Sequence, residues 1–228
     1  MLKLDSPALG FPADTLPRTI ANRTRRIYDR VSFLYPASTF FFHSRAHRQA
    51  LRVAGIEDGM RVLEVATGSG EMFRRLVHLN RHGETLGIDL SPKMAARTQR
   101  RARNGFAGVR AQCQAVDARY LPFRDDSFDA VVCCYMFELL AADDILSALL
   151  EIRRVLRAGG SLTVVLIGEN TEVFNRLYRL AGSVAPAFWG RQVEHSVPEL
   201  VESIDFRITA DCVVRQSFYP SRVLSARK

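Results

Sequence analysis

The sequence has no apolar run long enough to cross a lipid bilayer. Its longest run, around Val131 to Ala142, is interrupted by Glu138, whereas a spanning helix needs about 20 apolar residues. The segment Met1 to Pro7 also lacks the apolar core of a signal peptide. These absences argue against a membrane-spanning or secreted protein, and we expect a cytoplasmic one.

The four cysteines form no CxxC motif, in which two residues separate a pair. They are Cys113, Cys133, Cys134 and Cys212, and three of them fall in apolar, strand-like runs. This pattern favours buried thiols in a reducing compartment over disulfides or a zinc site. We expect no metal ligands.

Lysine is scarce although the chain is basic. It occurs only at Lys3, Lys93 and Lys228, so the formal net charge of +8 comes almost wholly from arginine. A basic chain suggests nucleic acid, anionic lipid or an acidic substrate as partner. The simpler interpretation, which we prefer, is an arginine-rich solvated surface. A length of 228 residues predicts one domain, with room for an appended cap.

One stretch of small residues predicts a ligand site. Arg61 to Val65 is a run of strand formers, Thr67 to Gly70 is a turn, and Glu71 to Leu79 spaces its apolar residues like a helix. This order brings backbone N–H groups and a helix N-terminus to the end of a buried strand. No Lys follows Gly70, which excludes a P-loop, and the third glycine of the dinucleotide fingerprint is missing.

Two acidic residues accompany this turn. Glu64 lies on the strand itself, where a carboxylate suits a ligand part that carries positive charge. Asp89 ends the predicted strand Gly83 to Asp89, 19 residues beyond Gly70. An acid about 20 residues past a glycine turn is the ribose-binding position of nucleotide-binding folds. We therefore predict that Asp89 accepts hydrogen bonds from a ribose diol.

The rest of the chain alternates strands and helices. Further strands are expected at Val109 to Val116, Ala130 to Cys134, Ser161 to Ile167, Phe206 to Val214 and Arg222 to Ala226. Further helices are expected at Pro92 to Arg103, Asp143 to Leu156 (closed by a glycine cap at Arg157 to Gly160), Glu172 to Val184 and Pro198 to Ser203. This alternation predicts an α/β fold, a Rossmann-like doubly wound sheet of seven mostly parallel strands. The last link is short, so the final strand should be antiparallel.

The N-terminal part reads differently. Residues 1–54 predict a proline-containing leader and a helical cap, and residues 55–228 the ligand-binding domain. The cap helices are expected from Thr19 to Tyr35, ended by Pro36, and from Phe40 to Gly55.

Four motifs follow one another at ordinary spacing. They are Val62 to Gly70, Leu86 to Met94, Asp117 with Leu121 to Val132, and Glu151 to Leu162. Together they resemble the class I S-adenosylmethionine-dependent methyltransferases, and within them the ubiquinone/menaquinone-biosynthesis (methyltransferase type 11) group. The resemblance covers roughly Arg25 to Lys228. The chain departs from it at Ala66 and Asp205, where many members carry glycine.

The resemblance implies S-adenosylmethionine as cofactor and assigns roles to the residues. Gly68 and Gly70 let the backbone approach its methionine part, and Glu64 lies near its ammonium. Cys134 and Tyr135 face the methyl group.

The nucleoside end is assigned in the same way. Asp89 takes the ribose hydroxyls, and Leu90 lies against the adenine. Asp117 accepts from the adenine amino group, while the Ala118 N–H reaches a ring nitrogen. The other implied cofactor contacts are Tyr28, Ala66, Thr67 and Met94.

The expected reaction is in-line transfer of the methyl group to a small-molecule or lipid-like acceptor, of the quinone-precursor or phospholipid type. A general base is needed only if the acceptor is a phenol, an acidic carbon or a protonated amine. The candidates are His43, His47, Tyr135, Glu138 and His195, among which His43 and Tyr135 come first.

Several other classes lack their motifs. Cys133 to Met136 replaces the Pro-Pro-aromatic loop of DNA amino-methylating enzymes, and Glu169-Asn170 matches only half of a magnesium-dependent catechol site. The alternative is a nucleic-acid or anionic-membrane binding protein on a methyltransferase fold, but Glu64, Asp89 and Asp117 all survive. As a further hypothesis, the arginine-rich helix after Arg18 lets the enzyme touch anionic membrane.

Overall fold

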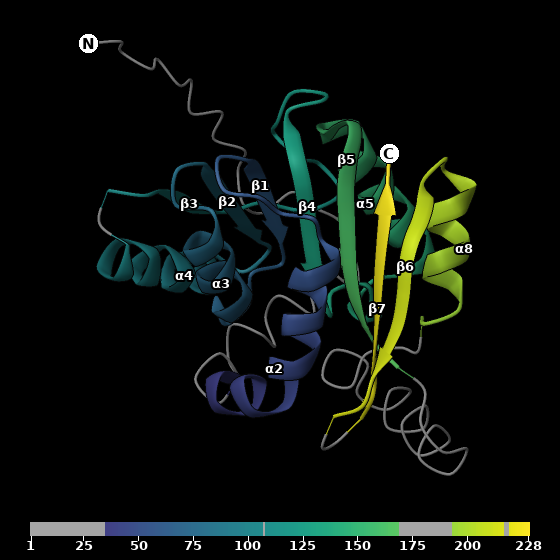
Figure 1. The fold of residues 1–228 in the computed structure, drawn as a ribbon, viewed down its shortest axis with the longest axis horizontal. Coiled ribbons are helices and arrows are strands. Elements are labelled where there is room, and N and C mark those ends of the chain that lie inside the picture. The colour runs from purple at the N-terminus through teal and green to yellow at the C-terminus, as the bar shows by residue number, and fades with distance from the viewer. Residues whose placement is uncertain (1–34, 107, 169–192, 217–218) are drawn as a thin grey trace, which may run out of the picture.

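The computed structural model describes residues 35–106, 108–168, 193–216 and 219–228, and side chains from residue 44 onward. The described strands form a seven-stranded sheet in the order β3-β2-β1-β4-β5-β7-β6 (Figure 1). The strands are β1 (Arg61–Val65), β2 (Glu84–Asp89), β3 (Arg110–Ala115), β4 (Phe128–Cys134), β5 (Leu156–Ile167), β6 (Arg207–Val214) and β7 (Ser221–Arg227). The helices are α2 (Tyr35–Val53), α3 (Glu71–Leu79), α4 (Pro92–Gly105), the 3-10 turn η1 (Phe137–Leu139), α5 (Ala142–Val155) and α8 (Ser196–Ser203).

The sheet has the predicted mixed topology. Strand β7 is antiparallel to both β5 and β6, and the remaining pairs are parallel. The doubly wound fold and its antiparallel last strand are therefore confirmed. Among the described residues, none of the helices combines the length and apolar character required to span a membrane.

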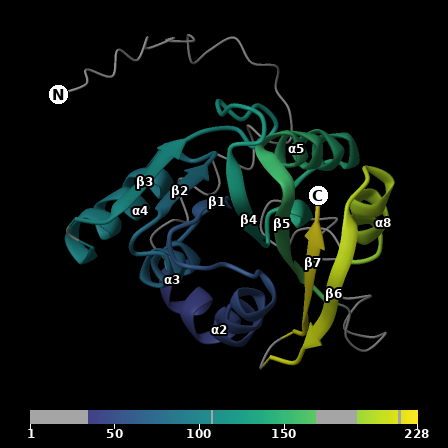
Figure 2. The ribbon, with the colours of Figure 1, turned by 45° about the horizontal axis from the view of Figure 1, so that its top comes forward.

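Helices cover both faces of the sheet (Figure 2). Alternate residues of β1 face opposite sides of the sheet. Val62 packs with residues of α2 and α3, whereas Leu63 and Val65 pack with residues of α5. On the face that α2 and α3 cover, α4 packs against α3 through Ala102. The central strands are apolar in both directions, as expected for parallel strands covered on both faces.

Most predicted helix boundaries lie within two residues of those observed, and two predicted features differ more. Helix α2 begins at Tyr35, not at Phe40, because a proline is tolerated in a first turn, where its missing N–H would have no helical partner. The glycine cap after α5 does not form. Arg157 to Gly160 already belong to β5, and the Gly159 N–H donates to the Lys228 carbonyl at 2.9 Å. This pairing with the end of the chain is a long-range contact.

Some predicted elements cannot be compared. The leader and the helix from Thr19, with Tyr28, lie outside the described residues, as does the helix from Glu172. The side chain of His43 also lies outside them.

The two departures from the methyltransferase pattern share one backbone conformation. Ala66 has φ 64° and Asp205 has φ 60°, both in the left-handed region that favours glycine. A residue with a Cβ there costs about 1–2 kcal/mol, and aspartate is among the residues that tolerate it best. Both positions therefore have the backbone conformation that glycine adopts most easily, although neither residue is glycine.

This conformation gives a stability prediction at Asp205. Replacing Asp205 by Val should lower the free energy of unfolding by about 1–3 kcal/mol, because a β-branched residue is strained at positive φ. Replacement by Gly should change it by less than about 1 kcal/mol. Urea unfolding at pH 7 measures both. Equal losses would instead assign the effect to the exposed ion pair between Asp205 and Arg153.

Candidate active site

Three acidic residues come to neighbouring strand ends. Strands β3, β2 and β1 are consecutive in the sheet. Glu64 is the last residue but one of β1, Asp89 ends β2, and Asp117 follows β3 by two residues. Asp89 lies opposite Ala115 of β3 in the strand register. The carboxyl edge of the parallel sheet therefore carries these acids side by side.

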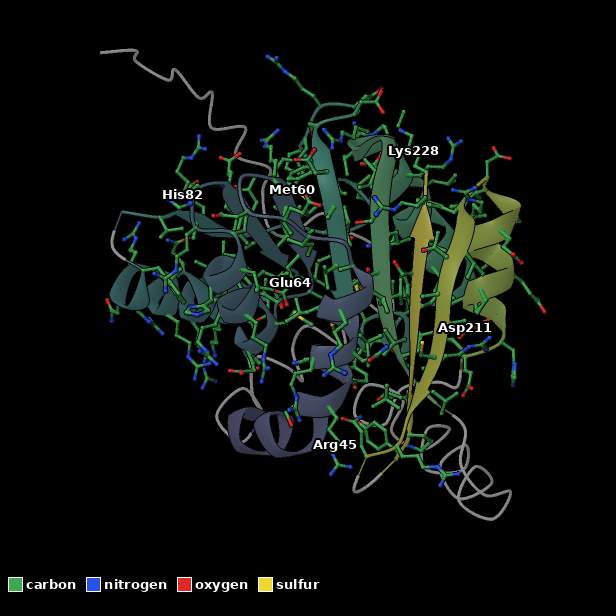
Figure 3. All side chains as sticks on the ribbon, in the orientation of Figure 1. Arg45, Met60, Glu64, His82, Asp211 and Lys228 are labelled. Atoms are coloured by element: carbon green, nitrogen blue, oxygen red, sulfur yellow. The ribbon has the colours of Figure 1, made fainter. Side chains whose placement is uncertain are left out.

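Glu64 is buried without a complete set of hydrogen bonds. Its exposed fraction is 1%, and its Oε2 atom has no hydrogen-bond partner among the described residues. Figure 3 places it near the centre of the molecule, beside α3. Burial first, and then the charges of Asp89 and Glu71, raise the pKa of this carboxyl well above its ordinary value. An isolated buried carboxylate is costly, so a cationic group placed here would be strongly stabilised.

The turn after β1 is fixed against β2. The Thr67 N–H donates to the Ile88 carbonyl at 3.0 Å, and the Gly68 N–H donates to Asp89 Oδ2 at 2.7 Å. Gly68 has φ 49°, and a Cβ added there would meet nothing within 4 Å. The turn therefore presents open backbone on one side. Gly70 is the N-cap residue that precedes α3, and a Cβ added to it would come within 2.7 Å of Thr98 Oγ1.

The Asp89 carboxylate is held by two backbone donors. Gly68 supplies the contact at Oδ2, and the Ser91 N–H donates to Oδ1 at 2.8 Å. Ser91 also accepts from the Met94 N–H and caps α4, which begins with Pro92. The predicted cap is thus present. The two backbone donors fix the orientation of the Asp89 carboxylate, which can accept about four hydrogen bonds in all.

Asp117 has a protein partner of its own. Its carboxylate pairs with the Arg119 guanidinium at 2.7 Å, and the same guanidinium reaches Asp144 of α5 at 2.7 Å. These carboxylates raise the pKa of Arg119. Next to this network, Ala118 packs against the core, and Leu90 is half-buried just after β2. Asp117 thus anchors Arg119 at the predicted adenine position.

The other predicted cofactor residues differ in their placement. Met94 is only 1% exposed and belongs to the core. Cys134 is half-buried at the end of β4, and burial raises the pKa of its thiol, so it is neutral at physiological pH. The Tyr135 hydroxyl lies 2.8 Å from Ser221 Oγ of β7, and this contact turns it toward β7. Among the described residues, no group of three or more His, Cys, Asp and Glu side chains is placed to hold a metal ion.

The chain is similar in sequence and fold to known proteins. A family model described as "Methyltransferase domain" matches residues 62–160. A ubiquinone/menaquinone biosynthesis C-methyltransferase of a Shewanella strain is 30% identical over 172 residues, which cover 74% of this chain and 67% of that protein. The chain belongs to the S-adenosylmethionine-dependent methyltransferases.

Two further similarities define the extent of the match to this methyltransferase family. An uncharacterized protein of Mycobacterium tuberculosis is 38% identical over 112 residues, 49% of this chain and 39% of that protein, so the chain spans about two fifths of its length. The crystal structure of the cyclase SpnF superposes with a TM-score of 0.75 at 19% identity, covering 93% of this chain and 98% of that one. At that identity it shows the fold alone.

The site fits the cofactor of the methyltransferase family. S-adenosylmethionine carries an ammonium group, a ribose diol and an adenine. Glu64 presents a buried carboxylate oxygen that lacks a partner in the described part of the chain, which suits the ammonium. Gly68 leaves open space along the turn, and Asp89 presents a fixed carboxylate at the ribose position.

The candidate general bases predicted from the sequence have distinct surroundings. Glu138, in η1, is 2% exposed; its Oε1 accepts from the Ile167 N–H at 2.7 Å. Its Oε2 has no partner in the described structure, and burial raises the pKa of the carboxyl to about 7. His47 is buried, with its ring 6.3 Å from the Tyr135 ring, and His195 is exposed before α8.

Sequence reasoning ranked Glu138 below His43 and Tyr135. The available signal was a single acid inside the otherwise apolar run from Val131 to Ala142. An acid inside an apolar run is buried together with its neighbours, and burial raises the pKa of its carboxyl toward 7. Buried position and neutral pKa are the properties expected of a general base at physiological pH.

The Glu138 pKa predicts a pH-dependent stability. Because the folded-state pKa is raised from 4.5 to about 7, the stability is greatest when the carboxyl is protonated and is lost as pH rises toward and through 7. Relative to Glu138→Gln, which stays neutral, the wild-type chain should lose about 2–3 kcal/mol of unfolding free energy between pH 5 and pH 8. Urea unfolding at the two pH values tests this. A difference that is the same at both would disprove the raised pKa.

Proposed function

We propose that this chain transfers a methyl group from S-adenosylmethionine to a small-molecule or lipid-like acceptor. The observation that carries the proposal is the Glu64 carboxylate at the end of β1, which is buried and lacks a partner for Oε2 in the described part of the chain. The cofactor's ammonium is the cation that this position suits. The Shewanella relative, by its name, acts in quinone biosynthesis at carbon, which supports a quinone-precursor type of acceptor.

Each residue at the strand ends would bind a different part of the cofactor. Glu64 would hold the ammonium, the backbone at Gly68 would lie along the methionine part, and Asp89 would accept from the ribose hydroxyls. We assign the adenine to Leu90 and to the backbone at Ala118, on the surface that Asp117 stabilises through Arg119. When bound, the cofactor supplies an electrophilic methyl group on a sulfonium sulfur.

The chain itself has to orient the acceptor and manage a proton. Alignment of the reacting atoms can supply about 7–11 kcal/mol of the barrier. For an acceptor that must lose a proton, we assign the base to Glu138, whose Oε2 has no hydrogen bond within the described residues. Its pKa of about 7 lets it take a proton at neutral pH and release it afterwards. The Tyr135 hydroxyl stays engaged with Ser221.

The alternative, a protein that only binds nucleic acid or membrane, is less well supported by the site. Such a protein has no use for a buried carboxylate at the end of β1, because the anion of its partner would be repelled there. Removal of that charge by mutation would relieve the cost of burial. The retention of Glu64 beside the open turn at Gly68 therefore favours the enzyme.

Two ligands separate the roles of Glu64 and Asp89. S-adenosylhomocysteine carries the amino-acid end, whereas 5′-methylthioadenosine lacks it but keeps the ribose and adenine. Glu64→Gln should weaken S-adenosylhomocysteine binding by roughly ten- to a hundredfold, the effect of losing a hydrogen bond to a charged group. Binding of 5′-methylthioadenosine should stay within about twofold. Titration calorimetry measures both affinities.

Asp89 gives the matched comparison. Asp89→Ala should weaken both ligands by roughly 1–3 kcal/mol, because both carry the ribose. If Glu64→Gln weakens both ligands equally, Glu64 is not the ammonium partner. If neither variant changes either affinity, the cofactor site lies elsewhere and the proposed function fails.

A further inference from the structure

A largely open groove lies between α3 and α4. Its volume is about 840 Å³, and blue-tipped, nitrogen-bearing side chains gather beside these two helices in Figure 3. Five arginines and one histidine line it: Arg74, His78, Arg81, Arg97, Arg100 and Arg101. Glu71 is the one acidic residue among the described lining residues. The groove is therefore strongly basic.

Helix periodicity explains why these residues meet. On α4 the lining positions 97, 100, 101 and 104 recur at the three- and four-residue spacing of one helix face, and on α3 the positions 71, 74 and 78 do the same. Beneath them Phe73 and Val77 of α3 pack against Ala102 of α4. The apolar contact fixes the two helices together, so their basic faces border the same groove.

Among the described residues, Glu71 is the acid that lines the groove, and Arg97 also makes an interaction within the protein. Glu71 pairs with Arg74 and with Arg75, each at 3.1 Å, all on α3. The α4 arginines have no acidic residue on their own helix, which runs from Pro92 to Gly105. Partial burial first, and then the charges of Arg101 and Arg100, lower the pKa of Arg97. Like charges this close repel one another, and an anion between them would relieve the repulsion.

We propose that the groove between α3 and α4 binds a diphosphate group. Guanidinium groups present paired N–H donors that match phosphate oxygens, so several of them around one groove suit a ligand with more than one phosphate. The groove is largely open to solvent, and its volume exceeds that of a single phosphate ion. The diphosphate can come from a soluble compound or from a lipid headgroup, since both present the same oxygens.

A simple solvated surface is the competing interpretation of the arginines. A solvated face needs no concave shape and tolerates acids among the bases, as on α3, where Glu71 pairs with two arginines. The α4 side instead concentrates Arg97, Arg100 and Arg101 on the one face that borders the groove. A concave basic wall of this kind focuses positive potential on whatever occupies it.

The test measures binding of inorganic pyrophosphate to the full chain by titration calorimetry at low ionic strength. The groove variant is Arg97→Gln/Arg100→Gln; Arg101 is left intact because it donates to the Ser69 carbonyl of the cofactor turn. The control, Arg48→Gln/Arg52→Gln, removes the same charge from exposed positions on α2. The groove variant should bind pyrophosphate at least about tenfold more weakly, and the control should stay within about twofold.

A vesicle measurement and an RNA measurement identify the source of the diphosphate, and together with the pyrophosphate titration they can overturn the proposal. Sedimentation with phosphatidylcholine vesicles that carry diacylglycerol diphosphate, against phosphatidylcholine vesicles alone, tests the lipid source. A loss confined to the groove variant supports it, and unchanged sedimentation supports a soluble ligand. Equal weakening of pyrophosphate binding in groove and control variants would mean bulk charge and would reject the site. So would the absence of pyrophosphate binding, or binding of a short RNA alone, which would indicate a nucleic-acid surface.

Two controls keep this result separate from the cofactor site. S-adenosylhomocysteine affinity should be unchanged in both double variants. A negative result for pyrophosphate would therefore leave the proposed methyl transfer standing, and a negative result for S-adenosylhomocysteine would leave the groove proposal standing. Circular dichroism shows whether the variants fold. The single variant Arg100→Gln, at an exposed position, provides a second measurement if the double variant does not.

Discussion

The structure depends on one unsatisfied electrostatic constraint, the buried carboxyl of Glu64. Its Oε2 has no hydrogen bond within the described residues, and the nearby charges of Asp89 and Glu71 make ionisation harder still. Protonation relieves this cost in the absence of ligand, and a bound cation relieves it more fully. Cofactor binding and folding are therefore linked, because a ligand that binds only the folded state stabilises it.

Burial acts on two carboxyls at the same edge of the sheet, with different results. Glu138 accepts a hydrogen bond from the Ile167 N–H, which keeps its pKa near 7. Glu64 has like charges close by, and its pKa is raised well above the ordinary value. After burial, the charges of both carboxyls contribute to the raised pKa of the Cys134 thiol at the end of β4. Both therefore lie near this thiol. Different surroundings thus suit one carboxyl to a fixed cation and the other to a mobile proton.

Local signals in the sequence were sufficient for the centre of the fold. Strand β1 and helix α3 have the predicted bounds because a strand-forming run, a small-residue turn and a helical spacing are adjacent. Contacts between distant residues were not predictable in this way. The Gly159 pairing with Lys228, the Tyr135 contact with Ser221 and the Arg119 bridge to Asp144 each depend on how the layers come together. The groove between α3 and α4 has the same origin.

The net charge of the chain and the charges close to the site have opposite effects on a cationic cofactor. A chain with a formal net charge of +8 repels S-adenosylmethionine, because the sulfonium and the ammonium of this ligand outweigh its single carboxylate. Over distances beyond about 8–10 Å salt screens that repulsion. Within that distance the local charges decide. Asp89 provides negative charge there, and so does Glu64 once a cation is bound beside it, whereas the charge of Asp117 is offset by Arg119. The basic α3–α4 groove meets this region through the Arg101 contact with the Ser69 carbonyl. An anion in the groove would lower the positive potential at the turn, so the two sites can be occupied together without electrostatic conflict.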